Sequence, residues 1–377
     1  MAGFIFAIGD EGLEGIKNCA KYGVYSTFVN GIASAKLPFE GTLADYCSMN
    51  EGDNVYFFYK RKIYGVGVMK KVGSDCKYNN YPGASKLVSS YSFDSTIQSQ
   101  MLFGRKRENM SNHWVCLFVP CPEFYLDGID MDDLLTYKPQ NLRRIRTFWK
   151  TSFIKVDDLE NDTIKEFLYL KNLGSKNVIT FNDSVHRRIN SIVNSNYLIN
   201  PCDLIPGCLD ATGFALKHEM AIEAILVDLL NKGLSSIFGK WDYVTHQLCA
   251  SPFKPIDYMD KIDVFAYKYR VVENSRFITK YLILELKANV ADDDTVIQVS
   301  KYVDYICKEY AYGDYGLIEA YVLANDISQI DLKKAKATAS RVYNIGSHPI
   351  ISKQWCDLHL VKYEVDGSSL KFDKIDI

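Results

Sequence analysis

The segment from Tyr281 to Ala288 is an apolar run that two charged residues interrupt, Glu285 and Lys287. Because side chains alternate between the two faces of a strand, Glu285 and Lys287 share one face, and the leucines at 282, 284 and 286 share the other. The leucine face predicts packing against a helix, while the opposite face presents a carboxylate and an amine together. For this pair by itself, the alternative is a half-buried edge strand with a solvated ion pair.

A second predicted strand adds another acid. Over residues 261–269, Ile262 and Val264 point to one side and Asp263 points to the other. If the two strands are neighbours, Asp263 and Glu285 come to the same end of the sheet.

Two predicted helices flank these strands. The helix over about 294–310 carries Gln298 and Tyr302 one turn apart on a common face. The amphipathic helix from about 214 to 230 carries Glu219 and Glu223 on one face, four residues apart. Either glutamate could supply a further carboxylate.

The order of elements in this half predicts a mixed α/β sheet. The expected elements are a helix at 214–230, strands at 244–248, 261–269 and 281–288, a helix at 294–310, a strand at 316–323, a helix at 330–343 and a strand at 358–365.

An acid pair, a lysine and a glutamine in this order suit metal-dependent cleavage of phosphodiesters. Mg²⁺ needs oxygen ligands and keeps several waters, so two carboxylates and a backbone carbonyl suffice. Such a metal lowers the pKa of a bound water and stabilises charge on a phosphate. We therefore expect Asp263 and Glu285 to bind Mg²⁺ or Mn²⁺ and Lys287 to orient or help deprotonate the attacking water. Gln298 would support the site.

This arrangement resembles the PD-(D/E)XK, or restriction-endonuclease-like, nuclease superfamily from about Gly213 to the C-terminus. The residues that carry the resemblance are Glu219, Asp263, Glu285, Lys287, Gln298 and Tyr302. The resemblance implies hydrolysis of DNA phosphodiesters on an αβββαβ core, with Glu219 as a helper of the two metal-binding acids and Glu223 as its rival. The sequence departs from the family pattern because no proline precedes Asp263. The alternative within this family is a degenerate, inactive domain.

The N-terminal half predicts a β-hairpin from residues 54–59 and 63–69, joined by the polar turn at 60–62. Gly65 and Gly67 indicate a bulge or a close approach of the backbone. The Gly-Asp strand followed by the Gly-x-Gly strand resembles EVE and related PUA-like modules over about 1–170, and 149–155 matches a late segment of such a module. The resemblance implies a small β-barrel that holds an extruded, often modified, base.

Candidate residues for nucleic-acid contact in this half are Tyr59, Asn112, Trp114, Trp149, Arg143, Arg144, Arg146 and Lys150. The aromatic and amide side chains suit stacking and hydrogen bonding with a base, and the basic side chains suit phosphate contacts. The alternative for each aromatic residue is a place in the core. The alternative for the basic cluster is a solvated turn or ion pairs with neighbouring aspartates.

Length and composition set the remaining expectations. A chain of 377 residues favours two domains: a recognition domain at 1–172, a linker at 173–206 and a nuclease domain at 207–377. The net charge of −2 argues against a purely electrostatic nucleic-acid binder. Ten cysteines without a Cys-x-x-Cys pair fit free thiols in a reducing cytoplasm. The first residues lack the pattern of a signal peptide, and no apolar run is long enough for a membrane span.

These features predict a cytoplasmic, metal-dependent DNA endonuclease. The pairing of a base-reading module with a nuclease suggests restriction of foreign DNA, including DNA with modified bases. Cutting both strands with one active site per chain would favour a homodimer. The alternative is a non-catalytic DNA- or RNA-binding protein with a degenerate nuclease-like domain.

Overall fold

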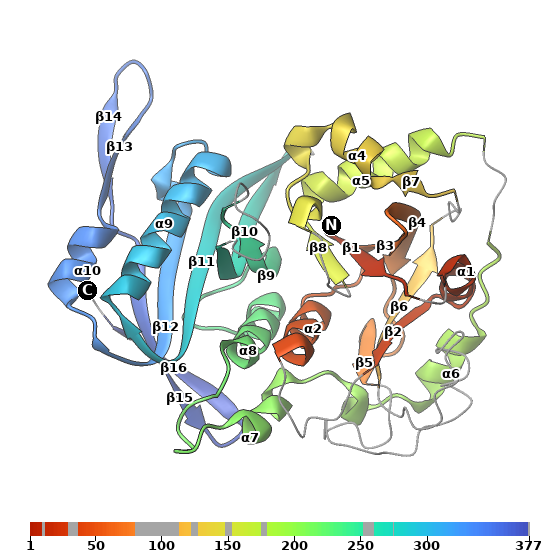
Figure 1. The fold of residues 1–377 in the computed structure, drawn as a ribbon, viewed down its shortest axis with the longest axis horizontal. Coiled ribbons are helices and arrows are strands. Elements are labelled where there is room, and N and C mark those ends of the chain that lie inside the picture. The colour runs from red at the N-terminus through yellow and green to blue at the C-terminus, as the bar shows by residue number, and fades with distance from the viewer. Residues whose placement is uncertain are drawn as a thin grey trace. The chain divides into compact units, whose positions relative to one another are not determined.

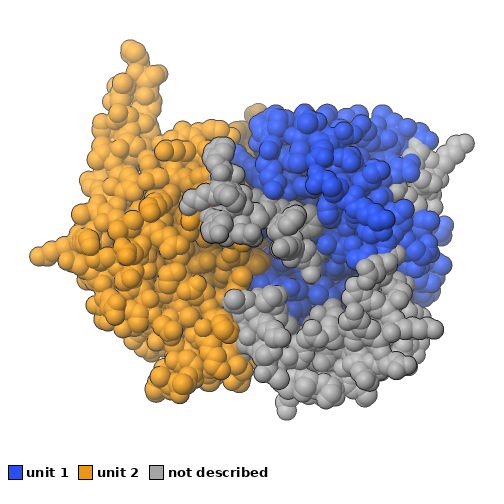
Figure 2. All heavy atoms as spheres, viewed as in Figure 1, with its two compact units in different colours: residues 1–200 blue, residues 201–377 orange. Residues whose placement is uncertain are grey.

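The computed structural model describes residues 1–9, 12–28, 37–79, 113–121, 127–147, 153–174, 179–251, 260–273 and 275–375. The chain divides into two compact units, Met1–Asn200 and Pro201–Ile377 (Figure 2). Both units contain helices and sheets, so the mixed α and β composition that the sequence predicts is confirmed.

The first unit is built around a curled sheet with the strand order β2-β6-β4-β3-β1-β8, to which β5 and β7 are attached (Figure 1). Its strands are β1 (Gly3–Ala7), β2 (Val24–Phe28), β3 (Asn54–Tyr59), β4 (Lys62–Met69), β5 (Lys77–Asn79), β6 (His113–Pro120), β7 (Ile129–Asp130) and β8 (Phe153–Val156). Its helices are α1 (Gly12–Tyr22), α2 (Leu37–Cys47), α4 (Met131–Tyr137), α5 (Asp158–Lys171) and α6 (Ser184–Ile192).

The predicted hairpin is present as β3 and β4, which pair antiparallel. Its register shifts between Val55 and Phe57, opposite Gly65, whose φ is 64°. A Cβ on Gly67 would lie 2.7 Å from Cδ2 of Phe118 on β6. Both glycines therefore have the roles that the sequence predicts, a bulge and a close approach.

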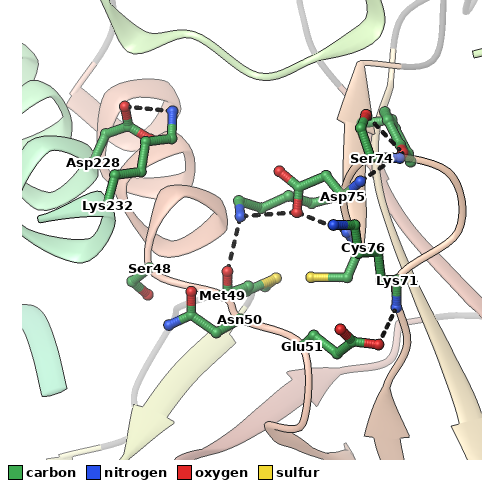
Figure 3. A network of polar contacts seen from close by, with 12 residues as sticks. Ser48, Met49, Asn50, Glu51, Lys71, Ser74, Asp75, Cys76, Asp228 and Lys232 are labelled. Carbon is green, nitrogen blue, oxygen red and sulfur yellow. Dashed lines mark hydrogen bonds and ion pairs between the residues drawn. The ribbon is translucent and has the colours of Figure 1, made fainter. Parts of the chain in front are cut away.

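A buried polar cluster fixes the loop before β3 to the strand β5. Nζ of Lys77 donates to the carbonyl oxygen of Met49 at 2.8 Å and lies 3.3 Å from Oδ1 of Asp75. The same Asp75 oxygen accepts the N–H of Cys76 at 2.6 Å (Figure 3). The charge of Lys77 is thus balanced locally, so this cluster is a structural element of the first unit.

The segment predicted as a linker, 173–206, contains folded structure. Val185 and Ile189 of α6 pack in one cluster with Val24 of β2 and Leu117 of β6. This part of the segment therefore belongs to the first unit, and the division between the units falls at residue 200.

The second unit contains a six-stranded sheet with the order β16-β15-β12-β11-β10-β9. Its elements are α7 (Ile205–Cys208), α8 (Glu219–Lys232), β9 (Tyr243–Cys249), β10 (Lys261–Val272), β11 (Ser275–Asp292), α9 (Asp293–Glu309), β12 (Ile318–Gln329), α10 (Leu332–Ala339), β13 (Arg341–Ile345), β14 (Ile351–Trp355), β15 (Leu358–Asp366) and β16 (Ser369–Ile375). Short 3-10 helices of the first unit lie at Pro139–Asn141, Ile145–Thr147 and Ser195–Tyr197, and those of the second unit lie at Pro201–Leu204 and Tyr315–Leu317.

The predicted order of helix, three strands, helix and strand is confirmed as α8, β9, β10, β11, α9 and β12. The strands β9, β10 and β11 form an antiparallel meander, and β11, β12 and β15 run parallel. The parallel connection from β11 to β12 passes through α9, which packs on both strands. This layout places the strand with Glu285 between the strand with Asp263 and β12.

Two predicted helix limits are wrong. The helix predicted from Phe214 begins only at Glu219, and Phe214 is 74% exposed. The helix predicted over 330–343 ends at Ala339, and the chain then forms β13 and β14 as a separate two-stranded sheet. The β-branched and aromatic residues Val342, Tyr343 and Ile345 explain this change because such residues favour strands.

No helix among the described residues is long and apolar enough to cross a membrane.

Candidate active site

The strands β10 and β11 separate where the two acids lie. Their backbone ladder runs up to the pair Val264 and Leu284. Beyond this pair, Oδ2 of Asp263 accepts the backbone N–H of Leu286 at 2.8 Å, so the side chain takes the position of a ladder partner. Asp263 is therefore held beside Glu285, the residue that precedes Leu286.

Glu285 is almost completely buried, with its side chain 2% exposed. Its Oε1 lies 2.9 Å from Nζ of Lys287, which confirms that the two side chains share one face of β11. Its Oε2 is buried without a hydrogen-bond partner among the described residues. A buried carboxylate oxygen without a partner is costly, and a bound cation or a proton would stabilise it.

Burial and mutual repulsion change the protonation of this pair. Burial raises the pKa of Asp263 well above its ordinary value, and the neighbouring charges of Glu285 and Glu223 raise it further. Burial also raises the pKa of Glu285 to about 7, although the ammonium group of Lys287 opposes this shift. Burial acts to lower the pKa of Lys287, but the charges of Glu285 and Glu219 outweigh it, so that pKa is raised. At neutral pH the site thus contains a protonated lysine beside two acids, and ionisation of one acid disfavours ionisation of the other.

The two glutamates of α8 have different surroundings. Glu219 opens the helix, and its Oε1 lies 3.7 Å from Nζ of Lys287. Glu223 lies one turn later and is buried, with Oε2 at 3.0 Å from Nδ1 of His246 and Oε1 accepting from Nε2 of Gln247 at 2.6 Å. Glu219 is therefore the acid that reaches the lysine, whereas the oxygens of Glu223 are occupied by β9.

Gln247 joins Glu223 to the acid pair. Its Nε2 also donates to Oδ1 of Asp263 at 3.2 Å. The backbone φ of Gln247 is 51°, which a residue other than glycine seldom adopts, and its position in β9 is passed over in the pairing with β10. Such strain is sustained where the surrounding structure fixes it, and here the two carboxylates do so.

Gln298 and Tyr302 form a pair on α9. Nε2 of Gln298 donates to the hydroxyl of Tyr302 at 2.8 Å. Burial raises the pKa of Tyr302, and the charges of Glu285 and Asp263 contribute to the increase. The hydrogen bond of Gln298 thus goes to Tyr302 of its own helix.

The donor set fits a divalent cation of the Mg²⁺ type. Within the described residues, no three His, Cys, Asp or Glu side chains are already arranged as a complete metal site. Mg²⁺ nevertheless requires only one or two carboxylates when water completes its coordination. The free oxygen of Glu285 and the adjacent carboxylate of Asp263 meet this requirement, and Glu219 stands across Lys287 from them.

The candidate residues of the first unit that the structure describes have different surroundings. Trp114 is 1% exposed, and its ring packs on Tyr46, so it lies in the core as in the alternative weighed for the aromatic residues. Tyr59 is half-buried at the end of β3, with Nζ of Lys60 5.3 Å from its ring centroid. The candidates Asn112, Trp149 and Lys150 lie outside the described residues.

The arginines of the predicted basic cluster are used within the first unit. Arg144 is buried, and its Nε donates to the carbonyl oxygen of Lys155 at 3.4 Å. The backbone N–H groups of Arg143 and Ile145 donate to Oε1 of Glu160 at 3.0 and 2.8 Å. Nε of Arg146 donates to the carbonyl oxygen of Leu142 at 2.7 Å. These contacts hold the turn before β8 in place. In the described part of this turn, Arg146 is exposed.

The sequence pattern does not predict a role in the site for His246 or Gln247. The only signal is the polar triplet 245–247 within a strand that otherwise reads as apolar. Since the left-handed backbone of Gln247 turns its side chain toward Asp263, strand alternation alone does not reveal the contact.

Comparison of the chain with models of protein families, with curated proteins and with solved structures finds no match.

Proposed function

We propose that the protein is a metal-dependent DNA endonuclease whose second unit belongs to the PD-(D/E)XK type. The observation that carries the proposal is the convergence of Asp263, Glu285 and Lys287 where β10 and β11 separate. The order α8, β9, β10, β11, α9 and β12 supports it because it is the αβββαβ order of that superfamily.

In this proposal, Asp263 and Glu285 would hold Mg²⁺ or Mn²⁺, which would make a bound water more acidic and offset charge on the phosphate. The ammonium group of Lys287 donates a hydrogen bond to the attacking water and so orients its lone pair toward phosphorus. The water oxygen bonds to phosphorus, the bond from phosphorus to one deoxyribose oxygen breaks, and the leaving oxygen takes up a proton from solvent while the water loses one.

The surrounding residues keep this geometry. Gln247 holds Oδ1 of Asp263, and the N–H of Leu286 holds Oδ2. Glu219 competes with Glu285 for Lys287, so the lysine is kept between the two acids. The first unit would choose the substrate as a PUA- or EVE-like module, with Tyr59 and Trp149 as candidate contacts to an extruded base. Restriction of foreign DNA is the biological role that suits this pairing.

The test is cleavage of plasmid and of phage DNA with modified bases, in the presence of Mg²⁺ or Mn²⁺. We expect the wild type to cut and Lys287→Met to lose activity by about 10²-fold or more, because it removes the group that orients the water. Asp263→Asn, prepared in the same way, should be equally inactive and also excludes a contaminating nuclease.

The matched control is Lys362→Met. Nζ of Lys362 lies 2.9 Å from Oε1 of Glu364, two residues away on β15, so the pair repeats the lysine–glutamate spacing of the site at an exposed position. This variant should cut as the wild type does. A wild type that binds DNA but cuts no substrate with either metal would instead favour the non-catalytic alternative, and full activity of Lys287→Met would remove the lysine from the mechanism.

A further inference from the structure

The two-stranded sheet of β13 and β14 projects from the rest of the second unit (Figure 1). We call residues 341–355 the ribbon. Isolated two-stranded sheets are only marginally stable in water, so a projecting one needs anchors at its base. The first cross-strand pair, Arg341 with Trp355, supplies them.

The two anchors contact the helix α9 and the strand β12. Arg341 forms a double contact with Asp304 of α9, with Nε at 2.8 Å and Nη2 at 3.1 Å from its two oxygens. Nε1 of Trp355 donates to the carbonyl oxygen of Ile318 at the start of β12 at 2.9 Å. The ribbon is therefore fixed to α9, the helix that carries Gln298, and to the strand that neighbours β11.

The charge of this region differs from that of the chain. The segment 332–356, which comprises α10 and the ribbon, contains no aspartate or glutamate, whereas the whole chain has a net charge of −2. Its basic residues are Lys333, Lys334, Lys336, Arg341 and Lys353. The side chains of Lys333 and Lys353 are exposed. The exposed Lys333 and Lys353 therefore favour an anionic partner, whereas Lys334 and Arg341 are paired with Asp293 and Asp304 of α9.

One face of the ribbon is exposed and carries three polar side chains beside Val342. The register pairs Val342 with Gln354 and Asn344 with Ser352, so these side chains share a face. Ser352 bonds Asn344 at 2.7 Å, and Nε2 of Gln354 donates to Oγ of Ser340 at 2.7 Å. Amide and hydroxyl groups of this kind form hydrogen bonds with phosphates and with the edges of bases.

We propose that the ribbon and α10 form a binding surface for double-stranded DNA, in which the ribbon enters a groove and the lysines contact phosphates. The major groove of B-form DNA admits a two-stranded ribbon, and single strands offer no such groove. This inference rests on the proposed function and deepens it, because it makes duplex DNA the substrate that the second unit receives beside Gln298.

A second copy of the chain is the competing occupant. Val342, beside the base of the ribbon, is 77% exposed, and Ile350, near its tip, is 65% exposed, and such side chains also suit protein contacts. Because the segment 332–356 contains basic but no acidic residues, DNA is favoured over a second copy, since two copies of the same basic segment would repel each other.

The experiment measures binding of a labelled DNA duplex and of one of its separated strands by fluorescence anisotropy, in chelator so that nothing is cut. The variant Lys333→Glu with Lys353→Glu should bind the duplex about tenfold more weakly, with a shallower dependence of affinity on salt because phosphate contacts are lost. The separated strand should lose less affinity. Substitution of Asn344 and Gln354 by alanine, which leaves the charge unchanged, should weaken duplex binding without changing the salt dependence.

The matched control is Lys362→Glu with Lys371→Glu, two exposed lysines on β15 and β16. It should bind the duplex as the wild type does. Equal losses in the control and the ribbon variant, or unchanged duplex binding in both ribbon variants, would overturn the inference. A wild-type dimer that becomes a monomer in the ribbon variant, measured by light scattering without DNA, would assign the ribbon to a second copy.

The two proposals fail separately. If the wild type binds the duplex through the ribbon yet cuts no DNA with either metal, the proposed function fails and the ribbon surface stands. If the wild type cuts DNA and the ribbon variants bind as it does, only the ribbon surface fails.

Discussion

Glu285 occupies a position in the sheet where its Oε2 accepts no hydrogen bond from the described residues. Its pKa is raised by burial from 4.5 to about 7. The folded chain therefore retains a proton that the unfolded chain loses between about pH 4.5 and 7. It follows that the contribution of Glu285 to stability is fully present below this window and is lost as the pH rises through it.

We expect Glu285→Gln to remove this loss of folding stability at rising pH. In chelator, the free energy of unfolding of the wild type should fall relative to that of the variant by about 3 kcal/mol between about pH 4 and pH 8, since one pKa unit corresponds to about 1.4 kcal/mol. Denaturant unfolding of both proteins at several pH values measures the difference. The exposed Glu364→Gln serves as control and should run parallel to the wild type. A constant difference between Glu285→Gln and the wild type across this range would contradict the raised pKa.

At the level of single residues, alternation along a strand was enough to predict one shared face for Glu285 and Lys287. The neighbouring place of Asp263 also followed, because β10 and β11 pair as adjacent strands. The role of Gln247 could not be predicted, since it depends on a left-handed backbone that no local pattern signals. The burial of Trp114 shows the same limit, because an aromatic residue has the same appearance in a sequence whether it lines a pocket or fills a core.

The helix α9 connects the candidate site to the ribbon. Asp292 caps its first turn, with Oδ1 accepting the N–H of Thr295 at 3.0 Å, and the hydroxyl of Thr295 completes a capping box. The same helix presents Gln298 toward Tyr302 and Asp304 toward Arg341. The helix α9 thus carries both Gln298, a candidate site residue, and Asp304, which anchors the ribbon.

We expect Asp292→Ala to destabilise the first turn of α9 by about 1 kcal/mol. The variant loses the two hydrogen bonds that Oδ1 of Asp292 accepts from the N–H and the hydroxyl of Thr295. Hydrogen exchange of the amides at 295–298 measures this local effect without requiring the whole chain to unfold in one step. Asp294→Ala, an exposed substitution in the same turn, should leave these amides protected. Equal exchange in both variants would show that the cap does not hold the helix start.

The elements were predictable where one pattern persisted over many residues. Helix α9 has a continuous period, and the helix predicted over 294–310 agrees with its bounds to one residue at each end. Strand β11 runs from Ser275 to Asp292 and is much longer than the predicted strand over 281–288. The ribbon was missed because lysines and alanines of α10 lead without a proline or glycine into β13, so the helical period seemed to continue to Tyr343. The cap residue Asp331 marks where α10 begins, but no comparable signal marks its end.

In the part of the chain that the structure describes, each molecule has one candidate site. A duplex has two strands of opposite direction, so one site must act twice or two chains must meet to break both. We expect nicked plasmid to form first, at a rate proportional to protein concentration, and linear plasmid to form at a rate that rises more steeply. Gel analysis over a range of concentrations measures both rates. Linear product without a nicked intermediate at the lowest concentrations would instead indicate a stable pair of chains.

Lys287 gives the resting molecule a counterion of its own. Its ammonium group lies 2.9 Å from Oε1 of Glu285 and 3.7 Å from Oε1 of Glu219. If the acids bind a divalent ion as proposed, that ion does not enter an empty anionic site, because part of its attraction is spent on loosening a contact that the chain already makes. On the proposed function, activity should consequently begin only at metal concentrations higher than the acids alone would need, and Lys287 would also set the metal threshold for cleavage.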